Sequence, residues 1–385
     1  MIYFDQAATS FPKPKEVLEA ITDYFYNVGG NVGRSAHKQA IDASEIVFNT
    51  RELLAELFNV RDSARIAFTK NVTESLNIAI NGFLEKDDRV LTTAIEHNSV
   101  MRPLRYWEHT GRIELSIIPT DRAAMPDLTE LEKLLRRNKY KLAVFNHASN
   151  VTGIIAPIEQ MTALCHQYGC KVLVDAAQTA GAYPIDVAAA GIDMLAFTGH
   201  KSLLGPQGTG GLYVSEGIEL LPLLRGGTGS NSAQETHPDF FPDLLEAGTL
   251  NIIGLAGLGA GVKYILDAGL NEIRDTEMKL TETFLNALKN NPEVEIYGAG
   301  DIDKRVAVVS FNLTGRSPSE VAYLLDKRYD IASRSGLHCS PSAHKALGTL
   351  PQGAVRFSFG LFNNEREVSI GVEAVREIID TKGAG

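Results

Sequence analysis

Residues 171–175, KVLVD, form an apolar run that ends in an acid, and AAQ follows at positions 176–178. A continuous apolar run of this kind is typical of a strand that is buried on both faces of a parallel sheet. Residues 194–201, MLAFTGHK, are a second apolar run that ends in polar residues. Both runs predict strands of an α/β sheet that carry ionisable groups at their carboxyl ends.

The same pattern extends on both sides of this pair, with helical patterns between most of the runs. The expected strands are Arg65–Thr69, Val90–Thr93, Ile113–Ile118, Leu142–Asn146, Lys171–Asp175, Met194–Thr198 and Gly211–Val214. The expected helices are Glu74–Phe83, Ser99–Thr110, Leu128–Arg137 and Ile158–Tyr168. Alternating strands and helices predict a mostly parallel sheet. The last two strands are joined by a loop too short for a crossover helix, so we expect antiparallel neighbours or near neighbours.

The pattern changes after about Gly269, where a smaller α+β domain is expected. Its expected elements are the helix Asn271–Lys289, the strand Val306–Leu313, the helix Ser319–Tyr329, the strand Ala354–Phe359 and the helix Glu365–Asp380. We therefore predict a large α/β domain at residues 15–268. Residues 1–14 and 269–385 are assigned to the small domain.

Composition limits the class of protein. The chain has 385 residues, of which 44% are hydrophobic and 22% charged, as in an ordinary soluble globular protein. Its formal net charge of −10 argues against a nucleic-acid surface and against an anionic membrane as the main partner. No stretch reaches the roughly 18 apolar residues of a membrane span. Residues 250–266 come nearest, but glycines, Asn251 and Lys263 interrupt them, which favours a buried helix.

The N-terminus and the cysteines indicate the compartment. MIYFDQAATSFPKPKEV has neither the basic nor the apolar region of a signal peptide. The three cysteines, Cys165, Cys170 and Cys339, form no CxxC pair, and their number is odd. This usage is typical of a reducing compartment, so a cytoplasmic location is expected.

Polar segments follow five of the expected strands. They are Lys70-Asn71-Val72-Thr73, Glu96-His97-Asn98, Asn150-Val151-Thr152-Gly153, Asp175-Ala176-Ala177-Gln178 and Thr198-Gly199-His200-Lys201. Ligands of open α/β sheets bind at the carboxyl ends of the strands. Five polar strand ends together therefore predict one convergent site.

The residue types at this site fit pyridoxal 5′-phosphate (PLP). A helix that begins near Val72 and Thr73 would offer N–H groups and a hydroxyl to a phosphate. A buried carboxylate such as Asp175 keeps a pyridine nitrogen protonated, which makes the ring an electron sink. Lys201, next to His200, would form a Schiff base with an aldehyde.

Each of these residues also has an ordinary structural interpretation when it is taken alone. Asp175 would cap a helix, and the His200-Lys201 pair would be solvated. A single histidine after a strand is usually structural. The glycine-rich run 205–211 lacks the GKS or GKT ending of a phosphate loop, which favours a turn. The functional interpretation depends on the whole set.

The order and spacing of these motifs resemble the class V aminotransferases of the type I PLP fold. Within that family they resemble the cysteine desulfurases, closest to the group II, selenocysteine-lyase-like branch. The resemblance extends from YFDQAATSFPKP at residues 3–14 to VRFSFGLFNN at residues 355–364. It implies a seven-stranded, mostly parallel sheet with a smaller α+β domain.

The resemblance also implies roles for residues that bind the cofactor. Lys201, in FTGHKSLLGPQGTGGLYV, would be the Schiff-base lysine. Asp175 would pair with the pyridine nitrogen, and Gln178 of DAAQ with the ring hydroxyl. The expected phosphate ligands are Thr73, Thr198 and His200, together with Thr249 of EAGTLN, which would reach across the interface of a homodimer.

Further roles concern the substrate and proton transfer. His97 of EHNS would stack on the ring and move protons, and Asn150 of NVTG would contact the cofactor or the substrate. Arg356 would bind the substrate carboxylate, a bidentate task that suits arginine. Arg34 of NVGRSAH is expected beside the substrate.

Cys339 lies in RSGLHCSP, which resembles the RxGxHC loop of the desulfurases. The resemblance implies that its thiolate attacks the substrate sulfur and becomes a persulfide. His338 and Arg334 are expected as cationic neighbours that favour the thiolate. A zinc site formed by His338, Cys339 and His344 is not expected, because no carboxylate or second cysteine pair accompanies them.

Two departures from the family pattern lie near the mouth of the site. Leu337 replaces the first histidine of the usual RxGHHC, and Gly33 stands where a histidine is common. They leave the choice between L-cysteine and L-selenocysteine open, and also the identity of a sulfur-acceptor protein. The leading hypothesis is conversion of L-cysteine to L-alanine. The alternatives are a selenocysteine lyase or another class V PLP enzyme, and then a non-catalytic scaffold for sulfur transfer.

Overall fold

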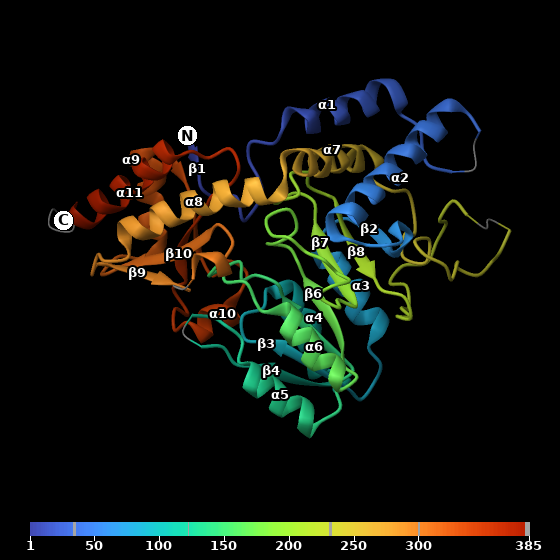
Figure 1. Ribbon diagram of the computed structural model, residues 1–385, viewed down its shortest axis with the longest axis horizontal. Coiled ribbons are helices and arrows are strands. Elements are labelled where there is room, and N and C mark those ends of the chain that lie inside the picture. Colours follow the sequence, from blue (N-terminus) through green and yellow to red (C-terminus); the bar gives the residue numbers. More distant parts are fainter. Residues whose placement is uncertain (34–35, 122, 231–232, 299–300, 382–385) are drawn as a thin grey trace.

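A seven-stranded sheet lies at the centre of the larger part of the computed structural model, which describes residues 1–33, 36–121, 123–230, 233–298 and 301–381 (Figure 1). The strand order is β2-β8-β7-β6-β5-β3-β4. Its strands are β2 (Ile66–Thr69), β3 (Asp88–Thr93), β4 (Ile113–Ile118), β5 (Leu142–Asn146), β6 (Lys171–Asp175), β7 (Met194–Thr198) and β8 (Gly210–Val214). Only β8 runs antiparallel to its neighbours, which confirms the predicted reversal after β7.

Helices cover both faces of this sheet, as an α/β architecture requires. They are α1 (Lys15–Asp23), α2 (Lys38–Phe58), α3 (Val72–Phe83), α4 (Asn98–His109), α5 (Leu128–Arg137), α6 (Ile158–Gln167) and α7 (Ile252–Ala268), with short helical turns at Tyr24–Val28 and Ser63–Arg65. In β5, Ala143 and Phe145 pack under α2, α5, α6 and α7, whereas Leu142 and Val144 pack under α3 and α4. Successive side chains of one strand thus fill two separate cores.

A four-stranded antiparallel sheet of order β12-β13-β10-β9 forms the smaller part of the molecule. Its strands are β9 (Val294–Tyr297), β10 (Val308–Leu313), β12 (Arg334–Gly336) and β13 (Ala354–Ser358). The helices around it are α8 (Leu270–Leu288), α9 (Pro318–Tyr329), α10 (Pro341–Ala346) and α11 (Glu365–Asp380), with a short turn at Ile302–Lys304. A phenylalanine cluster that includes Phe284, Phe311 and Phe357 fills its core.

The N-terminal strand belongs to the smaller part. β1 (Ile2–Tyr3) pairs in parallel with β11 (Ile331–Ala332). The chain then crosses toward the large sheet before α1 begins (Figure 1). The domain boundaries at residues 14/15 and 268/269 stay a prediction.

No single helix of the described ranges has the length and apolar composition needed to cross a membrane. The consecutive helices α7 and α8 pass that test only as a pair, and they are bent by 84° where they meet.

Candidate active site

Lys201 is half-buried in the turn that follows β7, three residues after the end of that strand. The charges of several predicted site residues act on its amine. Burial lowers the pKa of its amine to about 8. Asp175 opposes this shift, whereas Arg356 and Arg334 add to it. A larger fraction of the amine is therefore unprotonated near neutral pH, as a nucleophilic lysine requires.

Asp175 ends β6 and is 4% exposed. Its Oδ1 accepts a hydrogen bond of 2.9 Å from the backbone N–H of Ala177, and the hydroxyl of Ser99 lies within hydrogen-bonding reach of the carboxylate. Burial raises the pKa of Asp175, while these two donors and Lys201 oppose the shift. A buried carboxylate with few neutral donors fits a protonated pyridine nitrogen as its partner.

His97 is the N-cap of α4, directly after the turn that follows β3. Its Nδ1 accepts the backbone N–H of Ser99 over 3.0 Å, so Nε2 carries the proton of the neutral ring. Burial lowers the pKa of His97 to about 4, and the charges of Lys201, Arg102 and Arg356 contribute. His97 is therefore neutral at physiological pH.

Ser99 links His97 to Asp175, a role that the sequence analysis did not assign. Its hydroxyl lies 2.8 Å from Nδ1 of His97 and within reach of Asp175, so its one proton is donated either to the histidine or to the carboxylate. The signal was present in the EHNS motif, where only the histidine received a role.

The end of the site expected to hold a phosphate contains buried polar atoms that have no partner among the described residues. They are Oγ1 of Thr198 and Nδ1 of His200. α3 begins nearby at Val72 after its N-cap Asn71, and a Cβ at Gly210 would lie 2.9 Å from the Cα of Asn71. A helix N-terminus at a close backbone approach, with unpaired polar groups beside it, fits the phosphate of PLP.

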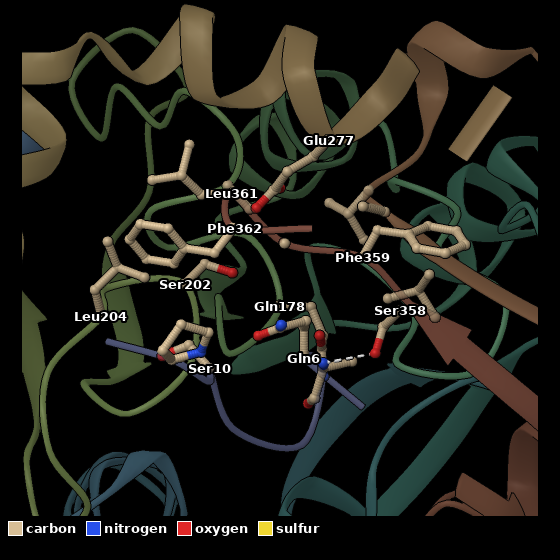
Figure 2. Close-up of a pocket in the computed structure, with 17 residues that line it drawn as sticks. Gln6, Ser10, Gln178, Ser202, Leu204, Glu277, Ser358, Phe359, Leu361 and Phe362 are labelled. Atoms are coloured by element: carbon tan, nitrogen blue, oxygen red, sulfur yellow. Dashed lines mark hydrogen bonds between the residues drawn. The ribbon is translucent and has the colours of Figure 1, made fainter. Parts of the chain in front are cut away.

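Gln178 lines a cavity between the two parts of the molecule (Figure 2). Its Nε2 donates to the carbonyl oxygen of Ala7 over 3.2 Å. Ser10 and Glu277 line the same cavity. The N-terminal segment therefore lies against the residue that the resemblance assigns to the ring hydroxyl.

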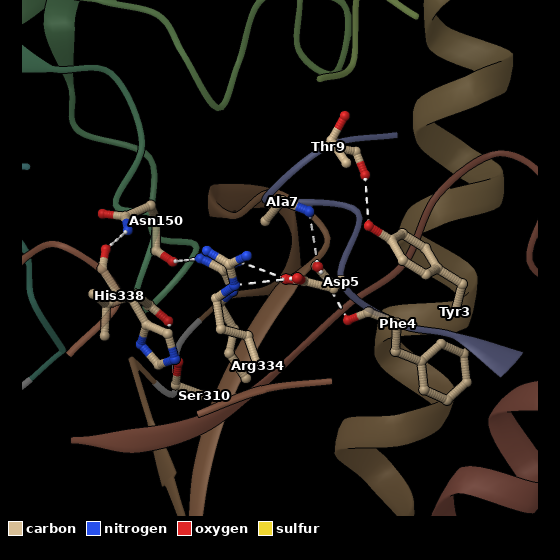
Figure 3. A network of polar contacts seen from close by, with 12 residues as sticks. Tyr3, Phe4, Asp5, Ala7, Thr9, Asn150, Ser310, Arg334 and His338 are labelled. Atoms are coloured by element: carbon tan, nitrogen blue, oxygen red, sulfur yellow. Dashed lines mark hydrogen bonds and ion pairs between the residues drawn. The ribbon is translucent and has the colours of Figure 1, made fainter. Parts of the chain in front are cut away.

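Arg356 lies in β13, 2% exposed, with both terminal nitrogens in use. The network of polar contacts around it includes Asp5, Asn150 and Arg334 (Figure 3). Nη1 donates to the carbonyl oxygen of Asn150 and Nη2 to Oδ1 of Asp5, both over 2.9 Å. Nε is buried and has no partner among the described residues. Arg334 faces Arg356 across the β12–β13 pair, and its Nε donates to Oδ2 of Asp5 over 3.1 Å. Asp5 thus joins two guanidinium groups, which the sequence analysis did not predict.

The loop of Cys339 is bound to the large sheet at three successive residues. Nδ2 of Asn150 donates to the carbonyl oxygen of His338, and its Oδ1 accepts the hydroxyl of Ser340, both over 2.7 Å. The backbone N–H of Asn98 donates to the carbonyl oxygen of Cys339 over 2.8 Å. His338 and Cys339 have φ angles of 49° and 57°, a left-handed conformation that residues other than glycine seldom adopt. Both hydrogen bonds of the Asn150 side chain are thus with this loop.

Cys339 is exposed, whereas the neighbouring His338 is buried. Burial and the charge of Arg356 lower the pKa of His338 to about 2, so the ring is neutral and supplies no positive charge. Arg334 is then the cationic neighbour that would favour a thiolate. His338 and His344 are 3.3 Å apart between Nδ1 and Nε2, and within the described ranges no three His, Cys, Asp or Glu side chains gather as a metal site.

Comparison with known proteins adds to this geometry. The sequence pattern described as aminotransferase class-V matches residues 2–370. The chain belongs to the class V aminotransferase family. A probable cysteine desulfurase of Methanothermobacter thermautotrophicus is 35% identical, over 98% of this chain and 94% of that protein. A cysteine desulfurase of Escherichia coli is 33% identical, over 98% and 93%.

Solved structures of this family have the same fold. The apo cysteine desulfurase of Thermococcus onnurineus superposes with a TM-score of 0.91 at 35% identity, covering 98% of this chain and 94% of that one. The cysteine desulfurase CsdA of Escherichia coli, in an S-sulfonic acid form, gives 0.86 at 30% identity with the same coverage. These matches confirm the predicted PLP fold with its mostly parallel central sheet.

Two expected site residues of this class V aminotransferase, Thr73 and Thr249, are exposed to solvent. Thr249 is exposed and lines a cavity with Lys70 and Gly208, close to the end of β2. Arg34 lies outside the described residues. Thr73 is exposed in the first turn of α3.

Proposed function

We propose that this class V aminotransferase is a PLP-dependent cysteine desulfurase, which converts L-cysteine to L-alanine and retains the sulfur on Cys339 as a persulfide. The observation that carries the proposal is an exposed cysteine on a loop tied to the carboxyl edge of the sheet through Asn150 and Asn98. The relatives named cysteine desulfurase support it.

Lys201 would hold PLP covalently through its amine, and Asp175 would face the pyridine nitrogen. Gln178 would bind the ring hydroxyl. The phosphate would be bound by Val72, Thr73, Thr198 and His200. When bound, PLP withdraws electrons from the amino acid and so weakens the bond from Cβ to sulfur. The side chain of Asn150 now binds the Cys339 loop, and a small movement of this loop would free it to contact the substrate.

The protein groups around the substrate have distinct tasks. Arg356, with Arg334 beside it, attracts the carboxylate. His97 is neutral and exchanges the proton on Nε2 with the substrate. Arg34 is assigned to the same side of the substrate.

The sulfur transfer is balanced without an external oxidant. The Cys339 thiolate forms a bond to the substrate sulfur while the bond from that sulfur to Cβ breaks. The electron pair of the broken bond stays on the carbon, which takes up a proton and becomes the methyl group of alanine. The substrate carbon is reduced and the transferred sulfur is oxidised.

A homodimer is also proposed, supported by exposed apolar side chains. Those near α1 and α2 are Leu18, Phe25, Tyr26, Ile41 and Phe48, and those before the Thr249 loop are Leu221, Leu223 and Leu224. Exposed apolar side chains that form a contiguous patch mark association surfaces. In the dimer Thr249 would reach the phosphate of the partner. We further propose a cytoplasmic location and a sulfur-acceptor protein at Cys339.

The deciding experiment incubates the PLP-loaded protein separately with L-cysteine and L-selenocysteine and measures alanine, sulfide, selenide and the mass of the Cys339 peptide. We expect a mass gain of one sulfur on Cys339. C339A should lose both this mass gain and desulfuration, whereas S342A, on the helix α10 that follows Cys339, should keep both. Unchanged desulfuration by C339A would overturn the proposal. Turnover of selenocysteine alone would indicate a selenocysteine lyase, and no turnover of either would indicate a scaffold.

A further inference from the structure

The carbonyl oxygen of His200, directly before Lys201, is the acceptor for several groups of the N-terminal segment. The backbone N–H of Ser10 and the hydroxyl of Thr9 each lie 3.0 Å from it. Nζ of Lys13 and the hydroxyl of Ser10 each lie at 3.3 Å. Lys13 also donates to Oγ of Ser10 over 2.8 Å. A part of the chain nearly 190 residues away in sequence thus binds the peptide that precedes Lys201.

The carbonyl of Lys201 itself is fixed by the following turn. It accepts the backbone N–H of Leu204 over 2.9 Å, and Leu204 has a left-handed φ of 61°. Ser10 lies on the same side of the cavity as Ser202 and Leu204 (Figure 2). The peptide groups on both sides of Lys201 are therefore held in place, one of them by the N-terminal segment.

Lys13 brings a positive charge that no carboxylate of the described residues neutralises. Among the described residues, its hydrogen-bond partners are the hydroxyl of Ser10 and the carbonyl of His200. Burial lowers the pKa of Lys13 to about 8. Burial and the charge of Lys201 lower the pKa of His200 to about 4, and the charge of Lys13 adds to this shift. A partly buried cation without a counter-ion is unfavourable, so an anion bound nearby would be stabilised by it.

The residues beside this charge are the ones assigned to the cofactor phosphate. His200 accepts the Lys13 contact through its carbonyl, while Nδ1 of its ring is buried and has no partner in the described residues. The hydroxyl oxygen of Thr198, two residues earlier in the chain, is also buried and without a partner in the described residues. The motif YFDQAATSFPKP received no functional residue from the sequence, yet its lysine lies at this point.

We infer that Lys13 is a positioning residue of the cofactor site: it holds the peptide before Lys201 through the carbonyl of His200 and attracts the phosphate of PLP. This inference rests on the proposed function. Lys15, two residues further, is the natural control, because its side chain is 79% exposed and only loosely paired with Glu19 at 3.8 Å.

The test compares K13M, K13R and K15M with the unmodified protein. The dissociation constants of PLP and of pyridoxal, which lacks the phosphate, are measured by titration of the visible absorbance, and the apo forms are melted in parallel. One charge-assisted hydrogen bond suggests about tenfold weaker PLP binding in K13M, with a smaller loss for pyridoxal. K13R should recover most of the affinity, and K15M should bind as the unmodified protein does.

The outcomes separate the inference from the function on which it rests. PLP binding by K13M equal to that of the unmodified protein would overturn the inference, as would equal losses for PLP and pyridoxal. If K13M lowers the melting temperature of the apo protein as much as it lowers that of the PLP-loaded protein, Lys13 has a structural role only. Failure of the unmodified protein to bind PLP through a lysine would instead overturn the proposed function.

Discussion

The carboxylate of Asp5 binds the guanidinium of Arg356 over 2.9 Å, across 351 residues of sequence. Its other oxygen binds Arg334, which faces Arg356 on the neighbouring strand. Two cations directly opposite each other in a sheet would repel, and Asp5 offsets one of the two charges. One positive charge remains, which matches the single carboxylate of an amino acid.

Replacing Asp5 with asparagine removes the partner of a buried cation. Because Arg356 is 2% exposed, we expect D5N to lower the free energy of unfolding by about 3 kcal/mol. L-Alanine should restore the melting temperature of D5N more than that of the unmodified protein, because its carboxylate can take the place of Asp5. Scanning fluorimetry with and without alanine measures this, and D326N, at an exposed pair with Lys327, is the control. Equal shifts by alanine in both proteins would contradict the expectation.

Asn150 is expected to control the mobility of the Cys339 loop. In N150A the carbonyl of His338 and the hydroxyl of Ser340 lose their partner, and both residues are buried. Hydrogen exchange of the 338–340 amides should become faster by roughly tenfold or more, since an unpaired buried group costs about 1–3 kcal/mol. Exchange mass spectrometry checks this, with N290A at an exposed position as the control. Unchanged exchange in N150A would mean that Asn98 alone holds the loop.

The strands of the large sheet were predictable because their burial is continuous. Leu142–Asn146, Lys171–Asp175 and Met194–Thr198 were predicted with the bounds that the structure has. A strand covered by helices on both faces needs apolar residues at nearly every position, which is a strong signal. In contrast, β1 and β11 have two residues each and exist because they pair with each other across the chain. Such short strands leave no periodic pattern in the sequence.

The same distinction applies to the site. Residues at strand ends, such as Asp175 and Lys201, were predictable because parallel strands bring their carboxyl ends to one edge. Asp5 and Lys13 lie on an irregular segment, and their partners are determined by how the two parts of the molecule meet. His338 was expected to be cationic, but burial, which the sequence does not reveal, makes it neutral.

Buried acids predict a loss of stability as the pH rises. Burial raises the pKa of Glu277 and of Glu96 to about 8, from an ordinary 4.5. Between these values the folded chain binds protons that the unfolded chain has released, so the free energy of unfolding falls with increasing pH. The buried histidines, such as His97 and His147 with a pKa lowered to about 4, act in the opposite direction near pH 6.5, because the unfolded chain still binds part of their protons there; this contribution fades by about pH 7.5.

The measurement is urea unfolding at several pH values between 6.5 and 8, and the slope of the unmodified protein is compared with that of the variant, because the histidine contribution is the same in both. Each of the two acids contributes a slope of up to about 1.4 kcal/mol per pH unit. E277Q should reduce the slope, because its neutral amide does not titrate, and E272Q at an exposed position of the same helix should not. A slope in E277Q as steep as in the unmodified protein would show that Glu277 is ionised in the fold.

The buried pair of Arg51 and Glu246 is expected to hold the segment that leads to Thr249. Two parallel contacts of 2.8 and 3.1 Å join the two side chains, and Glu246 also accepts the backbone N–H of Phe68 over 2.6 Å. E246Q leaves the arginine buried without a counter-charge, which should cost about 3–5 kcal/mol of stability. The double variant R51M/E246Q should be less destabilised than the sum of the two single variants, because it removes both charges. Urea unfolding of the four proteins measures the coupling, and additivity of the two changes would mean that each residue is held by other contacts.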